Sequence, residues 1–282
     1  MLVNVNGTTL YFDVEGAGLV PDGSRMRAKP TLILLHGGPG FDHTSYKPAF
    51  SVLADIAQII YLDHRGSGRS IGSTPDTWTL AQWGDDVKLF CDTLGIKRPI
   101  VYGGSFGGFV AQSYATRYPD HPGKIILAST AAKVHFDQMF MEFERIAGPD
   151  ARKVAEAYWL NPCVESRMKY IEVCVPLYHP CKADLKALKR AIIRNDVAIW
   201  FNGPKNEHGR MDFRCDLARI RCPVLILSGD RDPVTPMSFS ETIAACLPPH
   251  LVRIERFPGC GHGVHVDDPA RAFQVIRDFI LA

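Results

Sequence analysis

The residue of this 282-residue chain that is best placed to act as a nucleophile is a serine between glycines. Residues 103–107 read Gly-Gly-Ser-Phe-Gly; an apolar run with β-branched residues precedes them, and a helical pattern opens at Phe109. A serine on a tight strand-to-helix turn has a strained backbone, and its hydroxyl projects above the sheet beside the first amides of the helix. We therefore predict that Ser105 is a nucleophile.

The same spacing of glycine and serine occurs a second time, at residues 68–72 around Ser70. No strand pattern comes directly before Ser70 and no helix pattern directly after it, because a glycine-rich loop continues to Pro75. We therefore interpret Ser70 as part of a loop. At Gly103 and Gly107, in contrast, a side chain would collide with the helix or strand packed beside the turn, so glycine is the residue that fits.

A serine hydroxyl becomes a good nucleophile only when a base takes its proton and a third group orients that base. In hydrolases with this turn, an Asp or Glu and then a His follow the serine along the chain. Asp230 and Asp232 follow an apolar strand pattern, and His262 follows the next one. Both segments fall where loops at the carboxyl edge of a parallel sheet meet.

Strand and helix patterns alternate from residue 31 to residue 129, which is typical of an α/β protein with a doubly wound, mostly parallel sheet. The alternation resumes near residue 223. The predicted strands are 31–35, 56–62, 99–102, 124–128, 223–227 and 251–257, and the predicted helices are 80–94, a helix from 109 to about 118, 238–246 and 269–281. At the N-terminus, Asn6-Gly7 predicts a β-hairpin of residues 2–5 and 8–14, and residues 16–30 are expected to form a surface loop.

Between these two parts the alternation lapses. Helical patterns follow one another at 136–147, 151–160, 166–173 and 182–201 without a convincing strand. We therefore predict a helical cap insertion at residues 130–212, and an α/β core that is made of residues 1–129 and 213–282.

The composition is that of a soluble globular protein, with 46% hydrophobic and 22% charged residues. No apolar run approaches the roughly 18 residues of a membrane span, and the N-terminus lacks a basic segment followed by an apolar one, so we expect no membrane association and a cytoplasmic location. A net charge of +2 provides no strong field to recruit nucleic acid. The expected partner is a small-molecule or short-peptide substrate, and the oligomeric state stays open.

Neither a metal nor a cofactor is expected. The eight cysteines are scattered without a C-x-x-C pair, so we expect reduced thiols, most of them buried. No H-x-x-x-H or H-E-x-x-H pattern is present.

Several motifs together resemble those of the alpha/beta hydrolases and, more narrowly, of the proline iminopeptidase-like group. They occur in the order of that family: His-Gly-Gly-Pro-Gly at 36–40, Asp-x-Arg-Gly-x-Gly-x-Ser at 63–70, Gly-Gly-Ser-Phe-Gly-Gly at 103–108, Gly-Asp-Arg-Asp at 229–232 and Gly-His at 261–262. The resemblance implies the alpha/beta hydrolase fold with an inserted helical cap. It favours Asp232 over Asp230 as the acid and His262 over His250 or His265 as the base.

The resemblance also suggests how an oxyanion is stabilised. The backbone N–H of Phe106 and one from the loop at 36–40, most plausibly that of Gly38, are expected to form the oxyanion hole. Asp63 and Arg65 are expected to brace their loop, and His36, His43, His64, His135, His179 and His208 to be structural.

The narrower family implies an aminopeptidase that holds the free α-amine of its substrate with acidic side chains. Residues 203–207 resemble a Gly-Pro-Asn-Glu stretch of some relatives, so Glu207 is either an amine anchor or a solvated cap residue. Pro233 stands where relatives often have a second acid, and Phe106 where they often have Trp or Tyr. The first hypothesis is therefore a proline iminopeptidase-like aminopeptidase. Its alternative is a carboxylesterase, lactonase or amidase with the same three residues, and a non-catalytic ligand receptor on this fold is a third reading.

Overall fold

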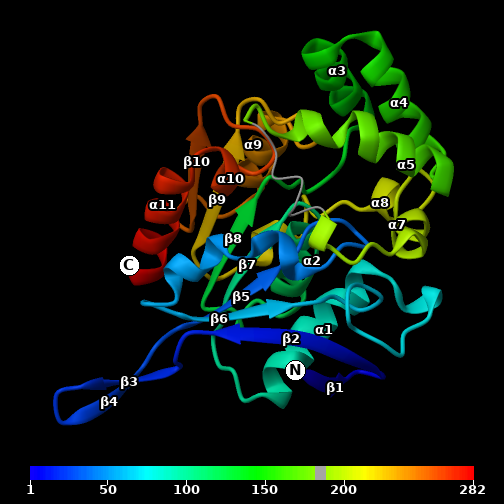
Figure 1. The fold of residues 1–282 in the computed structure, drawn as a ribbon. Coiled ribbons are helices and arrows are strands. Elements are labelled where there is room, and N and C mark those ends of the chain that lie inside the picture. Colours follow the sequence, from blue (N-terminus) through cyan, green and yellow to red (C-terminus); the bar gives the residue numbers. More distant parts are fainter. Residues whose placement is uncertain (182–188) are drawn as a thin grey trace.

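An eight-stranded sheet forms the centre of the protein (Figure 1). The structure is a computed structural model that describes residues 1–181 and 189–282. The strands of the sheet are β1 (Leu2–Val5), β2 (Thr8–Glu15), β5 (Thr31–Leu35), β6 (Gln58–Leu62), β7 (Ile100–Gly104), β8 (Lys124–Ala128), β9 (Val224–Gly229) and β10 (Val252–Phe257). Their spatial order is β1-β2-β6-β5-β7-β8-β9-β10. The first two pairs are antiparallel and all later pairs are parallel, which confirms the mostly parallel sheet.

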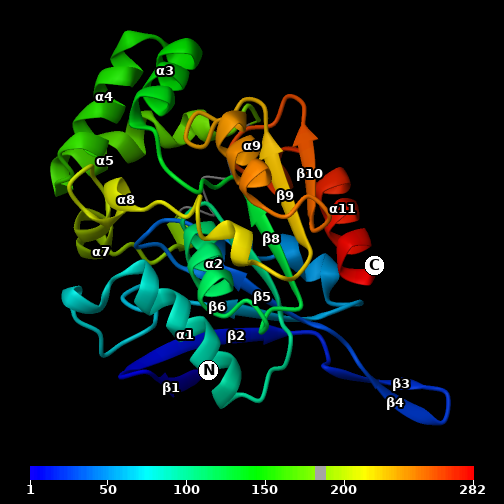
Figure 2. The same ribbon diagram turned by 180° about the vertical axis from the view of Figure 1, so that it is seen from behind.

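Helices cover both faces of this sheet (Figures 1 and 2). The helices of the core are α1 (Leu80–Thr93), α2 (Phe106–Arg117), α9 (Met237–Cys246), α10 (Val264–Asp267) and α11 (Pro269–Leu281). Side chains of α1, α2 and α9 join one buried cluster, and side chains of α11 join a second cluster on the other face. Short 3-10 helices lie at His43–Tyr46, Ala49–Leu53, Pro75–Thr77, Val175–Tyr178 and Leu217–Arg219.

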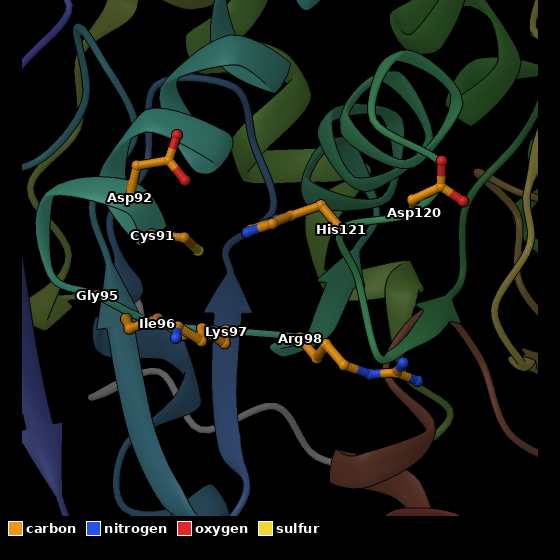
Figure 3. A pocket seen from close by; sticks show the side chains of 8 residues that line it. All are labelled: Cys91, Asp92, Gly95, Ile96, Lys97, Arg98, Asp120 and His121. Carbon is orange, nitrogen blue, oxygen red and sulfur yellow. The ribbon is translucent and has the colours of Figure 1, made fainter.

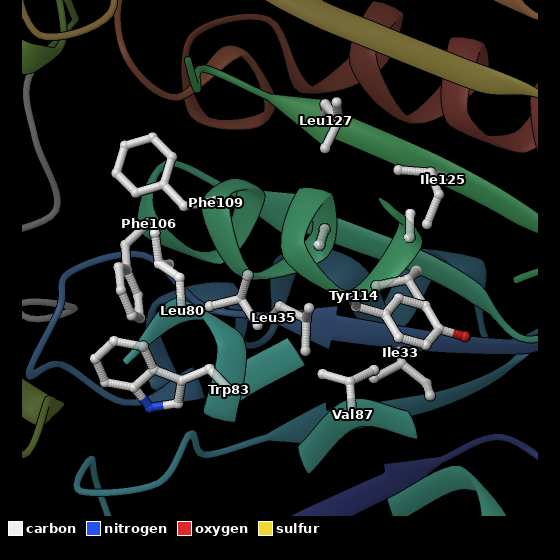
Figure 4. Close-up of a cluster of buried hydrophobic side chains, with 14 of the residues drawn as sticks. Ile33, Leu35, Leu80, Trp83, Val87, Phe106, Phe109, Tyr114, Ile125 and Leu127 are labelled. Carbon is white, nitrogen blue, oxygen red and sulfur yellow. The ribbon is translucent and has the colours of Figure 1, made fainter. Parts of the chain in front are cut away.

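The continuous apolar runs form the inner strands because both of their faces are covered. The four residues of β5 from Leu32 to Leu35 are completely buried. In Figure 4, Ile33 and Leu35 of β5 lie against Trp83 and Val87 of α1. Burial of a side chain of this size typically contributes about 1.5–3 kcal/mol.

Helix α1 begins and ends where its sequence indicates. The Thr79 side chain accepts a hydrogen bond from the Gln82 backbone N–H at 3.2 Å, which caps the first turn. Gly95, with φ of +68°, follows the last turn in a conformation that glycine adopts easily.

The predicted N-terminal hairpin is confirmed, and the structure contains a second hairpin after it that the sequence does not predict. Strands β1 and β2 pair around Asn6 and Gly7, both of which have positive φ. The prediction of a loop at 16–30 is wrong, because β3 (Leu19–Asp22) and β4 (Arg25–Ala28) form a second hairpin. This hairpin projects from the main sheet and β4 is exposed, so it has no buried face that would impose an alternating hydrophobic pattern (Figure 1).

Between β8 and β9 the described residues form helices (Figure 1). These are α3 (Phe136–Ala147), α4 (Pro149–Leu160), α5 (Val164–Val173), α7 (Asn195–Phe201) and α8 (Glu207–Arg210). We refer to them as the cap helices. Phe143 of α3, Tyr158 of α4 and Tyr170 of α5 belong to a hydrophobic cluster of their own.

One continuous helix at 182–201 was expected, and this prediction is wrong in its middle. Residues 182–188 lie outside the described part, and residues 191–194 are not helical. The Arg194 backbone N–H instead donates to the Gly40 carbonyl at 2.7 Å, and the Ile192 N–H donates to Asp42 Oδ2 at 3.2 Å. The segment therefore exchanges helical hydrogen bonds for bonds to the loop after β5. Within the described residues, no helix has the length and apolar character that a membrane span requires.

Candidate active site

Ser105 lies at the apex of the turn between β7 and α2, as predicted. Its backbone has φ 52° and ψ −118°, a strained conformation for a residue with a side chain. The fold enforces this conformation from both sides: the Ser105 N–H donates to the Ala128 carbonyl at 2.9 Å, and its own carbonyl accepts the Thr130 hydroxyl at 2.8 Å. The end of strand β8 and the residues just after it thus hold the turn in place.

The glycines of the turn are required by close packing, as predicted. A Cβ atom on Gly103 would lie 2.4 Å from the Gly107 carbonyl oxygen. A Cβ atom on Gly107 would lie 2.0 Å from the Leu35 carbonyl oxygen of β5. Both contacts are with backbone, which has no freedom to move aside, so larger residues would separate the helix from the sheet.

Asp232 and His262 meet at the carboxyl edge of the sheet, after β9 and β10. His262 Nδ1 lies 2.8 Å from Asp232 Oδ2. Asp232 is held by its own loop, because its Oδ1 accepts the N–H groups of Val234 and Thr235 at 2.8 and 2.9 Å. The Thr235 hydroxyl donates to Oδ2 at 2.6 Å. The Asp232 side chain is completely buried, whereas that of His262 is 11% exposed, so the imidazole forms the boundary between the buried acid and the solvent.

The other candidates have different neighbours. Asp230 is exposed and its Oδ1 accepts the Gly259 N–H at 2.8 Å. His265 packs against the rings of Tyr46 and Phe50, and burial lowers its pKa to about 4. His250 is exposed. Among these acids and histidines, the structure therefore brings together the pair Asp232 and His262.

The loop that carries His262 is fixed by the segment after α5. The His262 N–H donates to the Tyr178 carbonyl at 2.7 Å, and the two rings are 4.9 Å apart. Asp267 Oδ2 accepts the Gly261 N–H at 2.7 Å. Burial opposes ionisation of Asp267, but the His179 ring at 3.3 Å and hydrogen bonds from Cys181 and Gly261 keep its pKa below the ordinary value.

A cavity is lined by Ser105 and by Val234 and Thr235, which belong to the loop that carries Asp232. Its polar lining residues are Ser105, Asn202, His208 and Thr235; the others are Gly38, Pro39, Phe109, Val134, Met139, Trp159 and Val234. The free space is narrow, about 20 Å³, which is close to room for one water molecule. The Thr235 hydroxyl also bonds to Asp232, and its Oγ1 lies 3.4 Å from His262 Nδ1, so Thr235 links the cavity of Ser105 to the Asp232–His262 pair.

The two predicted oxyanion donors lie beside the serine. Gly38 lines the same cavity, and a Cβ atom on its neighbour Gly37 would be 4.0 Å from Ser105 Oγ. Phe106 is the first residue of α2, so its N–H has no acceptor within the helix. Its ring is buried against Trp83 and Phe201, with centroids 4.9 and 5.1 Å apart, which fixes the start of the helix.

Glu207 has a partner that the sequence did not indicate. Its Oε1 accepts the Leu80 N–H at 2.7 Å, at the first turn of α1. Burial raises the pKa of this carboxyl group. Glu207 is not among the residues that line the cavity beside Ser105. Its role as an amine anchor stays a prediction, and the structure offers helix capping as a second role.

The residues predicted to brace the loop after β6 do so. Asp63 is buried. Its Oδ1 lies 2.7 Å from His43 Nδ1, and its Oδ2 accepts a hydrogen bond from the Arg69 N–H at 2.9 Å. Arg65 forms two hydrogen bonds to Asp86, at 2.8 and 2.7 Å. The Ser70 hydroxyl donates to the Asp63 carbonyl at 2.7 Å and is buried in the loop, so it is placed as a structural serine.

Two cavity residues, Asn202 and His208, were missed as functional candidates. His208 was interpreted as structural and Asn202 was not considered, because both lie in helical cap segments without a recognisable motif. A polar residue next to an aromatic one, as in Phe201-Asn202, is a weak signal in a sequence. Only the folded chain brings these residues to Ser105.

A second cavity, of about 320 Å³, lies near the amino ends of β7 and β8, whereas Ser105 lies at the carboxyl end of β7 (Figure 3). It is lined by the end of α1, the connection to β7 and the residues after α2, including Asp92 and Asp120. Both carboxylates already have partners, because Asp92 bonds to Lys88 at 2.6 Å and Asp120 bonds to Arg221 at 2.8 Å. In residues 1–181 and 189–282, no cluster of three or more His, Cys, Asp and Glu side chains is suited to hold a metal ion.

The fold is that of the alpha/beta hydrolases, and comparison with known proteins agrees. The sequence model of the alpha/beta hydrolase fold matches residues 30–168. The chain is also similar to a proline iminopeptidase, PfmaB, of Pestalotiopsis fici, with 29% identity over 290 residues that cover 99% of this chain and 98% of that protein. The comparisons thus confirm the resemblance at the level of the alpha/beta hydrolase superfamily.

Solved structures with different activities share the fold. A proline iminopeptidase of Mycobacterium smegmatis superimposes with a TM-score of 0.76 at 20% identity, over 99% of this chain and 97% of that one. An enol-lactonase of Burkholderia xenovorans LB400 superimposes with a TM-score of 0.69 at 21% identity and covers 100% of both chains. At these identities the likeness establishes the fold, and the substrate has to be inferred from the site.

Proposed function

We propose that this protein is a serine hydrolase that cleaves an ester or amide bond through an acyl-enzyme intermediate. Ser105 is the nucleophile, His262 the base and Asp232 the group that orients the base. The observation that carries the proposal is the 2.8 Å contact of His262 Nδ1 with a buried Asp232, beside the cavity of Ser105. Because Nδ1–H donates to the carboxylate, Nε2 is left without a proton and can accept that of the serine.

The reaction then proceeds in two steps, acylation and deacylation of Ser105. Ser105 Oγ forms a bond to the substrate carbonyl carbon while His262 takes its proton; the leaving alcohol or amine departs with that proton. A water molecule then attacks the acyl-serine, again with His262 as the base, and Ser105 recovers its proton as the acid product leaves. The N–H groups of Gly38 and Phe106 stabilise the negative oxygen in both steps, each by a few kcal/mol, roughly. Side chains of the cap helices, among them Met139, Trp159 and His208, form one wall of the cavity and cover the site.

The lining of the cavity supports an uncharged acyl group. Among its described lining residues, none is Asp or Glu. A free α-amine is a cation, and its burial without a carboxylate costs several kcal/mol, roughly. Esters, lactones or neutral amides are therefore the substrates that we propose.

A proline iminopeptidase-like aminopeptidase is the second candidate. The observation in its favour is the 29% identity to a protein of that name along nearly the whole chain. It requires a carboxylate that reaches the amine, for which Glu207 is the residue that the sequence suggests.

One set of measurements tests both candidates. A fluorophosphonate probe is expected to label wild type and Ser70→Ala but not Ser105→Ala; labelling that depends on Ser70 would contradict the assignment. Hydrolysis of short p-nitrophenyl esters, of a lactone, and of prolyl arylamides with a free or an acetylated amine then distinguishes the substrates. Rapid ester hydrolysis with indifference to acetylation supports the first candidate, and strict dependence on the free amine supports the second.

A further inference from the structure

The wall of the cavity beside Ser105 contains two buried polar side chains that are incompletely satisfied. His208 is 4% exposed and Asn202 is 1% exposed. Among the described residues, neither His208 Nδ1 nor Asn202 Oδ1 has a hydrogen-bond partner. Buried polar atoms are nearly always paired with protein, water or ligand, because an unpaired one costs free energy. Two such atoms in the lining of one cavity indicate a place for a polar ligand group.

His208 is held in an aromatic enclosure. The rings of Phe109, Phe136, Trp159 and Phe201 surround it, with centroids 5.1–5.8 Å from that of the imidazole. This burial lowers the pKa of His208 to about 3, so the ring is neutral at physiological pH. A neutral imidazole offers one donor and one acceptor, and it has no charge with which to attract an ion.

Asn202 is fixed by a network of side chains. Its Nδ2 donates to the Tyr158 hydroxyl oxygen at 2.6 Å. The same oxygen accepts Arg167 Nη1 at 3.0 Å, and Arg167 Nε donates to Asn195 at 2.8 Å. The Nδ2 group of Asn202 is thus anchored, and its Oδ1 is left to accept a hydrogen bond from a ligand.

We propose that His208 and Asn202 form a hydrogen-bonding subsite for a neutral amide or carbamate group in the acyl part of the substrate. The pair offers complementary partners for the C=O and N–H of such a group. Among the described lining residues none is charged, which disfavours an ammonium or a carboxylate at this place. The acyl part is the one that stays on Ser105 while the leaving group departs, and because the free space is about 20 Å³, its binding requires the side chains that line the cavity to move apart. This subsite rests on the proposed function and specifies its substrate class.

Three p-nitrophenyl esters of nearly the same shape test the subsite. N-acetylglycinate carries the neutral amide, 4-methylpentanoate replaces it by hydrocarbon, and N-isopropylglycinate replaces it by an ammonium. Each enzymatic kcat/KM is divided by the rate of the same ester with hydroxide, which removes differences in intrinsic reactivity. Because a site with buried polar groups rejects analogues that lack the matching group, wild type should prefer the amide ester to the hydrocarbon ester by about tenfold or more.

Variants assign this preference to His208. His208→Phe fills the aromatic enclosure without a hydrogen-bonding atom, and it should reduce the preference about tenfold. His208→Asn keeps a polar atom near the position of Nδ1 and should retain most of it. His250→Phe makes the same change on the exposed surface and serves as the matched control with unaltered preference. Thermal unfolding of each variant shows that it is folded.

The outcomes separate the subsite from the proposed function. If the esters are hydrolysed but wild type favours the hydrocarbon or the ammonium ester, or if His208→Phe keeps the preference for the amide, the subsite is wrong. Calorimetric binding of N-acetylglycinamide provides a readout without turnover. If this amide binds wild type more tightly than His208→Phe while no ester is hydrolysed, the subsite stands and the proposed function is wrong. Equal binding to both proteins overturns the subsite.

Discussion

The carboxylate of Glu207, in α8, accepts a hydrogen bond from the backbone N–H of Leu80, in α1, with 2.7 Å between the two atoms. The two residues are separated by 127 positions in the sequence. This contact places a negative charge at the N-terminus of α1, where the helix dipole favours it. It also ties a cap helix to a helix of the core.

We predict that Glu207→Ala lowers the free energy of unfolding by about 0.5–2 kcal/mol, as the loss of a helix cap does. Glu207→Gln keeps an acceptor oxygen and should lose less. Urea unfolding of the three proteins measures the difference. If Glu207→Ala unfolds like wild type but loses selectivity for a free amine, Glu207 is an amine anchor and not a cap.

The two neighbouring aspartates should differ strongly in their effect on activity. Asp232→Asn removes the acceptor that holds the proton on His262 Nδ1, and we expect kcat to fall by about a thousandfold or more. Asp230→Asn alters an exposed loop bond to Gly259 and should change kcat by less than about threefold. Steady-state hydrolysis of a short p-nitrophenyl ester compares them. A larger loss in Asp230→Asn would show that the acid has been assigned incorrectly.

The buried neutral His208 should make the protein sensitive to acid. Its pKa is about 3 in the folded protein, whereas an unfolded histidine titrates near about 6.5. As the pH falls below about 6.5, the unfolded chain binds a proton at this residue and the folded protein does not. The contribution of His208 to the free energy of unfolding is therefore complete above that pH. It is lost between about pH 6.5 and pH 3, at up to about 1.4 kcal/mol per pH unit.

In His208→Phe this contribution is absent. Urea unfolding at pH 7 and pH 4.5 should therefore show a smaller loss of stability on acidification in His208→Phe than in wild type. The exposed control His250→Phe should lose as much as wild type. An equal loss in His208→Phe and wild type would show that His208 is protonated in the folded protein.

Gly107 should not tolerate even one added methyl group. The new Cβ of Gly107→Ala would lie 2.0 Å from the Leu35 carbonyl oxygen, so α2 must shift away from β5 and carry Ser105 with it. We expect severe loss of stability and of fluorophosphonate labelling. Gly72→Ala is the control: its φ is +80° but no atom lies within 4 Å, so it should cost only about 1–2 kcal/mol. A stable, labelled Gly107→Ala protein would contradict the packing of the turn.

Most of the fold could be predicted from the sequence because its signals are local. The apolar run at 31–35, the cap at Thr79 and the stop at Gly95 each depend on a few neighbouring residues, and the structure places their elements as predicted. The signal for the turn at Ser105 is equally local, since glycines occur where the helix and the sheet are too close for a side chain. Where no face is buried, as in β3 and β4, the local pattern is lost and the prediction was wrong.

The candidate acid and base could be predicted only partly from the residues themselves. The order of Ser105, Asp232 and His262 is a property of the sequence, but the choice of Asp232 over Asp230 came from family resemblance. In the structure the choice has a physical basis: the N–H groups of residues 234 and 235 turn the Asp232 carboxylate inward to His262, while Asp230 faces solvent.

Only the tertiary structure decided the surroundings of the serine. The sequence by itself determined the fold class and the candidate residues at the strand ends, with Asp230 and Asp232 both possible as the acid, because backbone geometry and hydrophobic burial act over short stretches. The helical break at 191–194 depends on hydrogen bonds to Gly40 and Asp42, about 150 residues away. The position of Asn202 and His208 beside Ser105 depends on how the cap helices pack over the sheet. Contacts of this kind leave no local pattern, since each partner is an ordinary residue until the chain has folded.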